Sequence, residues 1–153
     1  MSITSRLSTA FALVRYFPKR REVIASTLVL LRPFIAINPQ RFADYLLSDS
    51  GSAYLSGVLS FHMAAVVKQT GAHRLNSEIQ YNLMLDDFFD SLAPGHGSKL
   101  RQRVNDLVDA RELAVTNALT AGFRETEQTY ERLQRSETPE EALPTLINWL
   151  VQD

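Results

Sequence analysis

Apolar side chains recur at intervals of three and four residues along most of the chain, and this spacing limits the fold more than any other feature. In the longest such stretch, residues 98–135 contain no proline and only one glycine. Their apolar positions follow one helical stripe. No segment shows a convincing alternation of apolar and polar residues, as expected for a half-buried strand. The sequence therefore predicts an all-α helical bundle of about six to seven helices.

Prolines, glycines and capping residues divide this pattern into separate helices. A proline ends a helix or occupies its first turn, and asparagine, serine or threonine caps its start. We expect helices from about Ile3 to before Pro18, from Pro18 to about Leu31, from Pro39 to Leu46, over 52–69, 76–91 and 98–135, and after the Thr138–Glu141 capping box, with a kink or restart at Pro144.

The helix near residues 98–135 is the longest of these. Unbroken, it would be about 55 Å long at ~1.5 Å per residue. A compact domain of 153 residues does not need such a helix. Either it breaks near Gly122, or part of it projects and pairs with another chain. Projection would favour a homo-oligomer.

Small residues lie along one side of the helix expected over 52–69. Ala53, Gly57 and Ala64 share this side, and Ser60 follows Gly57 by three residues. Small side chains let the backbone of a neighbouring helix approach closely. This helix is therefore expected to make a tight helix–helix contact.

Length and composition favour one helical domain over residues 1–153 that needs no disulfide or structural metal. The chain has no cysteine, which removes thiol nucleophiles and cysteine-bound zinc and is compatible with a cytoplasmic location. No run of about 18 uninterrupted apolar residues is present, so we expect no transmembrane segment. No cofactor is expected either.

Charge is divided unevenly along the chain. Residues 1–41 contain seven Lys or Arg and one acid, a net of +6, and residues 42–153 contain nine bases and sixteen acids, a net of −7. Such a division indicates that the basic end meets an anionic partner, or that the two ends meet each other within or between molecules.

A basic cluster lies at the start of the second predicted helix. Lys19, Arg20 and Arg21 occupy the first turn after Pro18, and Arg15 precedes them. Cations at a helix start oppose the helix dipole, so local stability does not explain them. Together with the free N–H groups they form a candidate site for phosphate, an acidic protein face or lipid headgroups. Alternatively, the cluster is a solvated corner or pairs with the acidic remainder.

An aspartate-rich segment is the second candidate site. The sequence Asp86-Asp87-Phe88-Phe89-Asp90 resembles the DDxxD box of isoprenyl-diphosphate and terpene synthases. That resemblance implies a Mg²⁺ site at Asp86, Asp87 and Asp90 that would neutralise a leaving pyrophosphate. The alternative is structural, with the phenylalanines in the core and the three aspartates in water.

Histidines give no catalytic pattern. His62 lies among apolar residues of its helix and is expected to be structural, and the sequence has no HExxH spacing. We therefore expect a non-enzymatic interaction or scaffold protein that self-associates and contacts an anionic partner through its basic N-terminal segment. The alternatives are a nucleic-acid-binding subunit of a larger complex and a small Mg²⁺-dependent enzyme acting on a diphosphate.

Overall fold

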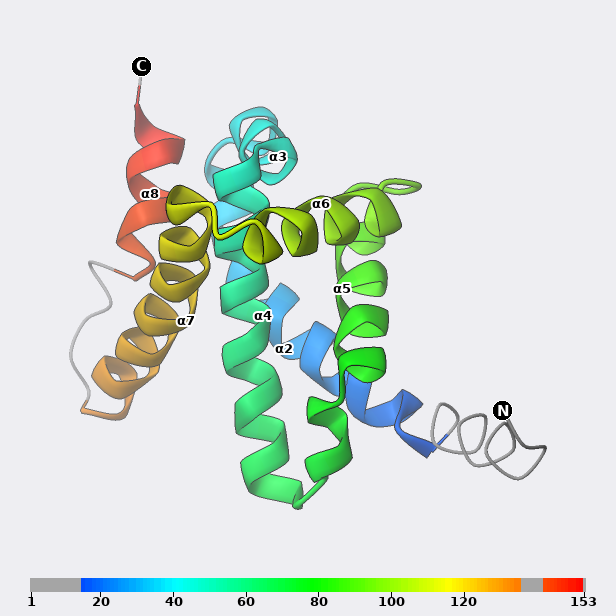
Figure 1. Ribbon diagram of the computed structural model, residues 1–153. Helices are drawn as coiled ribbons and strands as arrows, with labels where there is room; N and C mark the ends of the chain where they lie inside the picture. The colour runs from blue at the N-terminus through cyan, green and yellow to red at the C-terminus, as the bar shows by residue number, and fades with distance from the viewer. Residues whose placement is uncertain (1–14, 136–141, 153) are drawn as a thin grey trace.

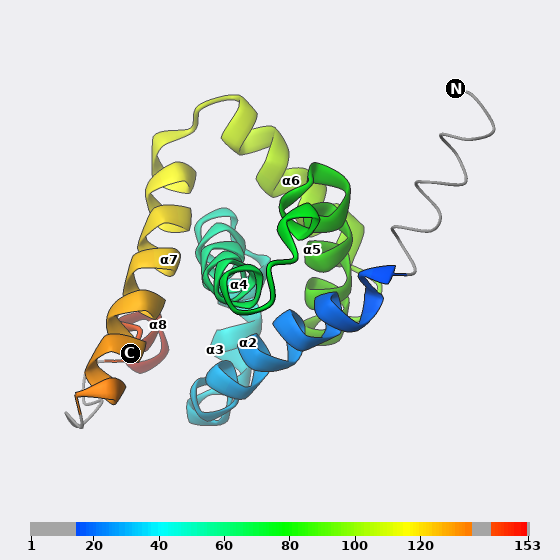
Figure 2. The same ribbon diagram turned by 90° about the horizontal axis from the view of Figure 1, so that it is seen from below.

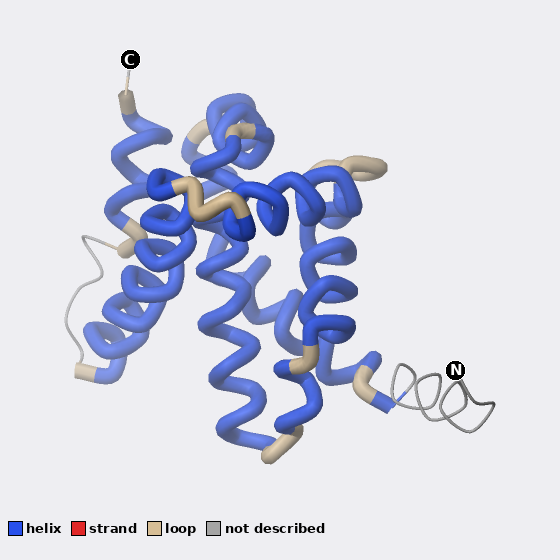
Figure 3. The backbone as a smooth tube through the Cα atoms, in the orientation of Figure 1, coloured by secondary structure: helices blue, strands red, loops and turns tan. Residues whose placement is uncertain are grey.

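The computed structural model describes residues 15–135 and 142–152. In these residues there are seven α-helices, one 3₁₀ helix and no strand (Figures 1 and 3). This confirms the predicted all-α bundle. In chain order the elements are α2 (Phe17–Ile37), α3 (Pro39–Leu47), α4 (Asp49–Thr70), η1 (His73–Asn76), α5 (Glu78–Leu92), α6 (Gly97–Asp109), α7 (Leu113–Gln134) and α8 (Pro144–Val151).

Helix α4 forms the centre of the bundle, with α2, α3, α6 and α7 packed around it (Figure 2). Its residues from Gly51 to Leu59 are all buried. By length and composition α4 could cross a membrane, but 67% of its most apolar window is buried inside the protein, as is typical of a core helix. The absence of a transmembrane segment stays a prediction.

Helices α4 and α7 touch backbone to backbone. A Cβ atom added to Gly57 would lie 2.0 Å from the carbonyl oxygen of Leu119, and one added to Gly122 would lie 2.0 Å from that of Tyr54. Real Cβ atoms do not approach other atoms so closely. The close contact expected from the small residues of this helix is confirmed at Gly57, whereas Ala64 is exposed.

The single long helix predicted near residues 98–135 is wrong, because the chain forms α6 and α7 with a sharp turn between them. The alternative break near Gly122 is also wrong, because the turn lies at residues 110–112 and Gly122 is inside α7. Arg111 adopts a left-handed conformation with φ of 56°. The N–H of Glu112 donates to the carbonyl of Leu107 at 3.0 Å, which closes the end of α6. Arginine thus occupies a position where glycine is the usual signal. The projecting helix that favoured self-association is not formed.

Two prolines test the predicted helix boundaries differently. Helix α2 was expected to end near Leu31, but it continues through Pro33 to Ile37. Proline has no N–H, so the carbonyl one turn earlier in the helix loses its usual donor. Pro33 lies on the exposed side of α2, where water can bond that carbonyl. Buried Leu31 and Phe34 hold the inner side of the helix against the core. At Pro144 the expected restart is confirmed, since α8 begins there. The first predicted helix and the Thr138–Glu141 capping box lie outside the described residues.

Candidate functional site

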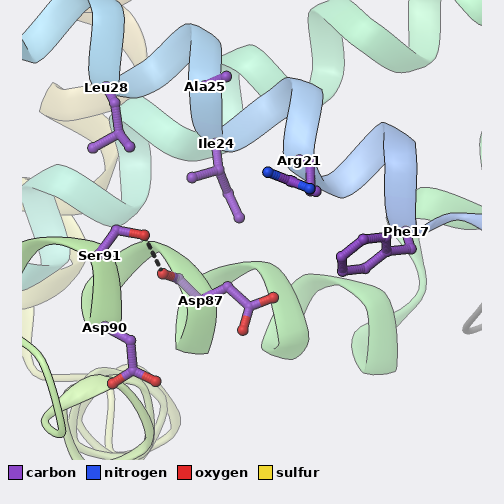
Figure 4. A pocket seen from close by; sticks show the side chains of 8 residues that line it. All are labelled: Phe17, Arg21, Ile24, Ala25, Leu28, Asp87, Asp90 and Ser91. Atoms are coloured by element: carbon purple, nitrogen blue, oxygen red, sulfur yellow. Dashed lines mark hydrogen bonds between the residues drawn. The ribbon is translucent and has the colours of Figure 1, made fainter.

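A groove between α2 and α5 brings together parts of both predicted sites (Figure 4). The sequence presented the basic cluster and the aspartates as two separate candidates, but the fold places them on facing walls. The groove has a volume of about 510 Å³. It is lined by Phe17, Arg21, Ile24, Ala25 and Leu28 from α2 and by Asp87, Asp90 and Ser91 from α5.

Three of the four predicted cations lie at the surface around the start of α2. Arg15 and Arg21 are exposed, and the side chain of Lys19 is 38% exposed with Glu22 at 3.5 Å. The guanidinium of Arg21 lies 5.7 Å from the centre of the Phe17 ring, which is itself 47% exposed. No acid occupies the first turn of α2. We call Arg15, Phe17, Lys19 and Arg21 the basic end of α2.

Arg20 has a different position from the other three cations. It is only 6% exposed, and its Nη1 donates to Oε1 of Gln80 on α5 at 2.5 Å. Burial lowers the pKa of Arg20, and the nearby charge of Asp87 partly opposes this effect. Arg20 therefore joins α2 to α5 inside the protein and is not displayed to a partner.

The three aspartates point to different partners. Asp86 Oδ1 accepts from Nε of Arg101 at 2.8 Å, and Asp90 Oδ1 accepts from the backbone N–H of Gly97 at 2.7 Å. Asp87 lines the groove on the wall that faces α2 (Figure 4). Burial raises its pKa; Arg20 opposes this rise, and the two neighbouring aspartates reinforce it. Among the described residues, no three His, Cys, Asp or Glu side chains are grouped to hold a metal ion.

Buried His62 and partly buried Tyr130 form a hydrogen-bonded pair that the sequence did not reveal. His62 on α4 is 4% exposed, and its Nδ1 lies 2.9 Å from the carbonyl oxygen of Val58. Because a carbonyl only accepts, Nδ1 carries the proton, and Nε2 accepts from the Tyr130 hydroxyl of α7 at 2.7 Å. Burial lowers the pKa of His62, which favours this neutral form. The two residues are 68 positions apart, and no local pattern links them.

This pair predicts a pH-dependent stability. Because the folded pKa of His62 lies below the unfolded value of about 6.5, its contribution to stability is complete above that pH and is lost as the pH falls through the folded pKa. We expect the free energy of unfolding in urea to fall between about pH 7 and 5, by up to ~1.4 kcal/mol per pH unit. His62→Gln should flatten this slope, and exposed His73→Gln should not. Equal slopes in all three proteins would refute the assignment.

Comparisons of the chain with protein-family models, with curated proteins and with solved structures found no match. No relative therefore lends this chain a function. A function has to be inferred from the protein's own surface, where the exposed cations at the start of α2 are the most distinctive feature.

Proposed function

We propose that this protein is a non-enzymatic helical adaptor that binds an anionic phospholipid surface through the basic end of α2. The supporting observation is the exposure of Arg15, Lys19 and Arg21 around an exposed Phe17. Cations that meet headgroup phosphates beside an aromatic ring that enters the acyl boundary are typical of segments at a membrane surface.

The basic end of α2 lies at one edge of the bundle. This position favours a partner, such as a bilayer, that contacts the protein only there. The start of α2 leaves the bundle on the side away from α7 (Figures 1 and 2). A bilayer reached there would lie away from α7. Of the acidic remainder, in which residues 42–153 carry a net charge of −7 from nine bases and sixteen acids, Asp87 and Asp90 line the groove beside Phe17 and Arg21. Anionic lipids are concentrated in the cytoplasmic leaflet, so a cytoplasmic location fits the proposal.

Nucleic acid and a second copy of the chain are weaker alternatives as partners. A phosphate backbone is followed by cations spread along a surface, whereas these three lie around one helix start. An exposed Phe17 has an apolar environment to enter in a bilayer, whereas on a nucleic acid it needs an unpaired base to stack on, which a duplex does not offer. Self-association is supported by the uneven charge alone, now that the long projecting helix is absent.

Sedimentation with lipid vesicles tests the proposal. The protein should bind vesicles of phosphatidylcholine and phosphatidylserine on the order of 100-fold more strongly than pure phosphatidylcholine, at ~1 kcal/mol for each of three cations. High salt should reduce this difference, because it screens exposed charges. Equal binding to both vesicles would refute the proposal. Preferential binding of duplex DNA, or a salt-sensitive dimer without lipid binding, would assign the basic end to one of the other partners.

A further inference from the structure

Beyond their glycine contact, α4 and α7 diverge (Figure 1). Their side chains line two adjoining hollows, and Glu22 and Ser26 of α2 also line the smaller one. The larger has a volume of about 630 Å³ and the smaller about 270 Å³. Phe61 and Tyr130 line both hollows, so we treat the two as one α4–α7 cleft. Because backbone contact fixes where the helices cross, the cleft is a built-in feature of the bundle.

Aromatic rings form the wall of this cleft. The rings of Phe61 and Tyr130 are stacked with their centres 5.5 Å apart and an angle of 14° between them. Phe123 meets Phe61 edge to face, at 5.5 Å and 71°. The bond from the Tyr130 hydroxyl to buried His62 holds the tyrosine ring in place. All three rings are only partly buried. They form a pre-organised wall that a ligand can reach.

Carboxylates outnumber cations around the rings. Glu127 and Glu131 are exposed one turn apart on α7 and line the larger hollow, where the facing cation is Lys68 of α4. Glu22 lines the smaller hollow, with Lys19 at 3.5 Å. A positively charged ligand is therefore favoured over an anionic one.

From the rings and carboxylates together, we propose that the α4–α7 cleft binds a small organic cation of the quaternary ammonium type. The electron-rich faces of aromatic rings attract such a cation. Because its charge is covered by alkyl groups, the cation binds water weakly and loses little hydration on contact with the rings. Glu127 and Glu131 supply the negative charge that balances the cation. The cleft adjoins the basic end of α2, because Glu22 of the smaller hollow pairs with Lys19. Its test uses no lipid, so its outcome is independent of vesicle binding.

Comparing choline with its uncharged isostere, 3,3-dimethyl-1-butanol, separates the effect of charge on binding from the effect of shape. Titration of the native protein, followed by NMR of its aromatic protons, should show saturable choline binding that shifts the Phe61, Phe123 and Tyr130 signals. The alcohol should bind about tenfold more weakly, because it lacks the cation–π and carboxylate interactions. Equal affinity for the two molecules, or no saturable choline binding, overturns the proposal.

Paired variants locate the site. Glu127→Gln with Glu131→Gln should weaken choline binding about tenfold and leave the affinity for the alcohol unchanged. Glu78→Gln with Glu112→Gln removes the same charge from exposed positions outside the cleft and should leave choline binding within about twofold. All four side chains are exposed, so both variants should fold, as circular dichroism would verify. Equal loss in both variants would mean that net charge alone attracts choline, and the cleft would not be its site.

Discussion

Gly122→Ala is expected to lower the free energy of unfolding by about 3 kcal/mol, although it adds only one methyl group. That methyl carbon would lie 2.0 Å from the carbonyl oxygen of Tyr54 on α4. A side chain can relieve a clash by changing its rotamer, but helix backbone atoms cannot. The two helices would therefore have to move apart along a tightly packed contact. Overpacking costs ~1–3 kcal/mol and occasionally more, and a clash with backbone at 2.0 Å belongs above that range, at ~4 kcal/mol. The ~1 kcal/mol that alanine gains over glycine within a helix then leaves a loss of about 3 kcal/mol. Urea denaturation measures the difference.

Gly95→Ala is the matched control for this prediction. It makes the same chemical change in a loop with open space around the added carbon, where the cost comes from the positive φ of 84°. That strain amounts to ~1–2 kcal/mol. Gly57→Ala should resemble Gly122→Ala, because its added carbon would meet the carbonyl of Leu119. If Gly122→Ala were as stable as the native protein, α4 and α7 could not cross with their backbones in contact.

Local signals in the sequence were sufficient to predict most helix boundaries. Asn38 caps α3 by accepting from the N–H of Arg41 at 3.1 Å, and Gly71 ends α4 in a left-handed conformation. These features depend on a few neighbouring residues. Two other features do not depend on neighbouring residues alone: the end of α6 at Arg111 and the continuation of α2 through Pro33. Each goes against a local preference, which tertiary packing overrides, and a single sequence carries no signal of that packing.

The candidate site was only partly predictable for the same reason. The sequence identified the cations and the aspartates but not their environments. Arg20 is buried because Gln80, sixty residues later, faces it. Asp86 is paired with Arg101 of α6, across a turn whose path depends on the fold. The His62–Tyr130 pair joins two helices that meet through glycines far apart in the chain. Residue type was readable from the sequence, whereas pairing required the structure.

Replacing Arg15, Lys19 and Arg21 together by glutamine is expected to reduce binding to phosphatidylserine-containing vesicles on the order of 100-fold. Each cation near an anionic membrane contributes ~1 kcal/mol, and three such contributions multiply in the partition coefficient. These side chains lie at the surface, so the bundle should keep its fold. Arg20 is left in place because it holds α2 to α5 through Gln80.

The partition coefficient of this triple variant, compared with that of a control of equal charge, tests the central claim most directly. The control carries Arg32→Gln, Lys99→Gln and Arg124→Gln, three exposed cations outside the basic end of α2. If the basic end is the contact, the control should bind phosphatidylserine-containing vesicles within about threefold of the native protein, since distant exposed charges are largely screened. Equal losses in the two variants, or no loss in the first, would contradict a contact at the basic end of α2.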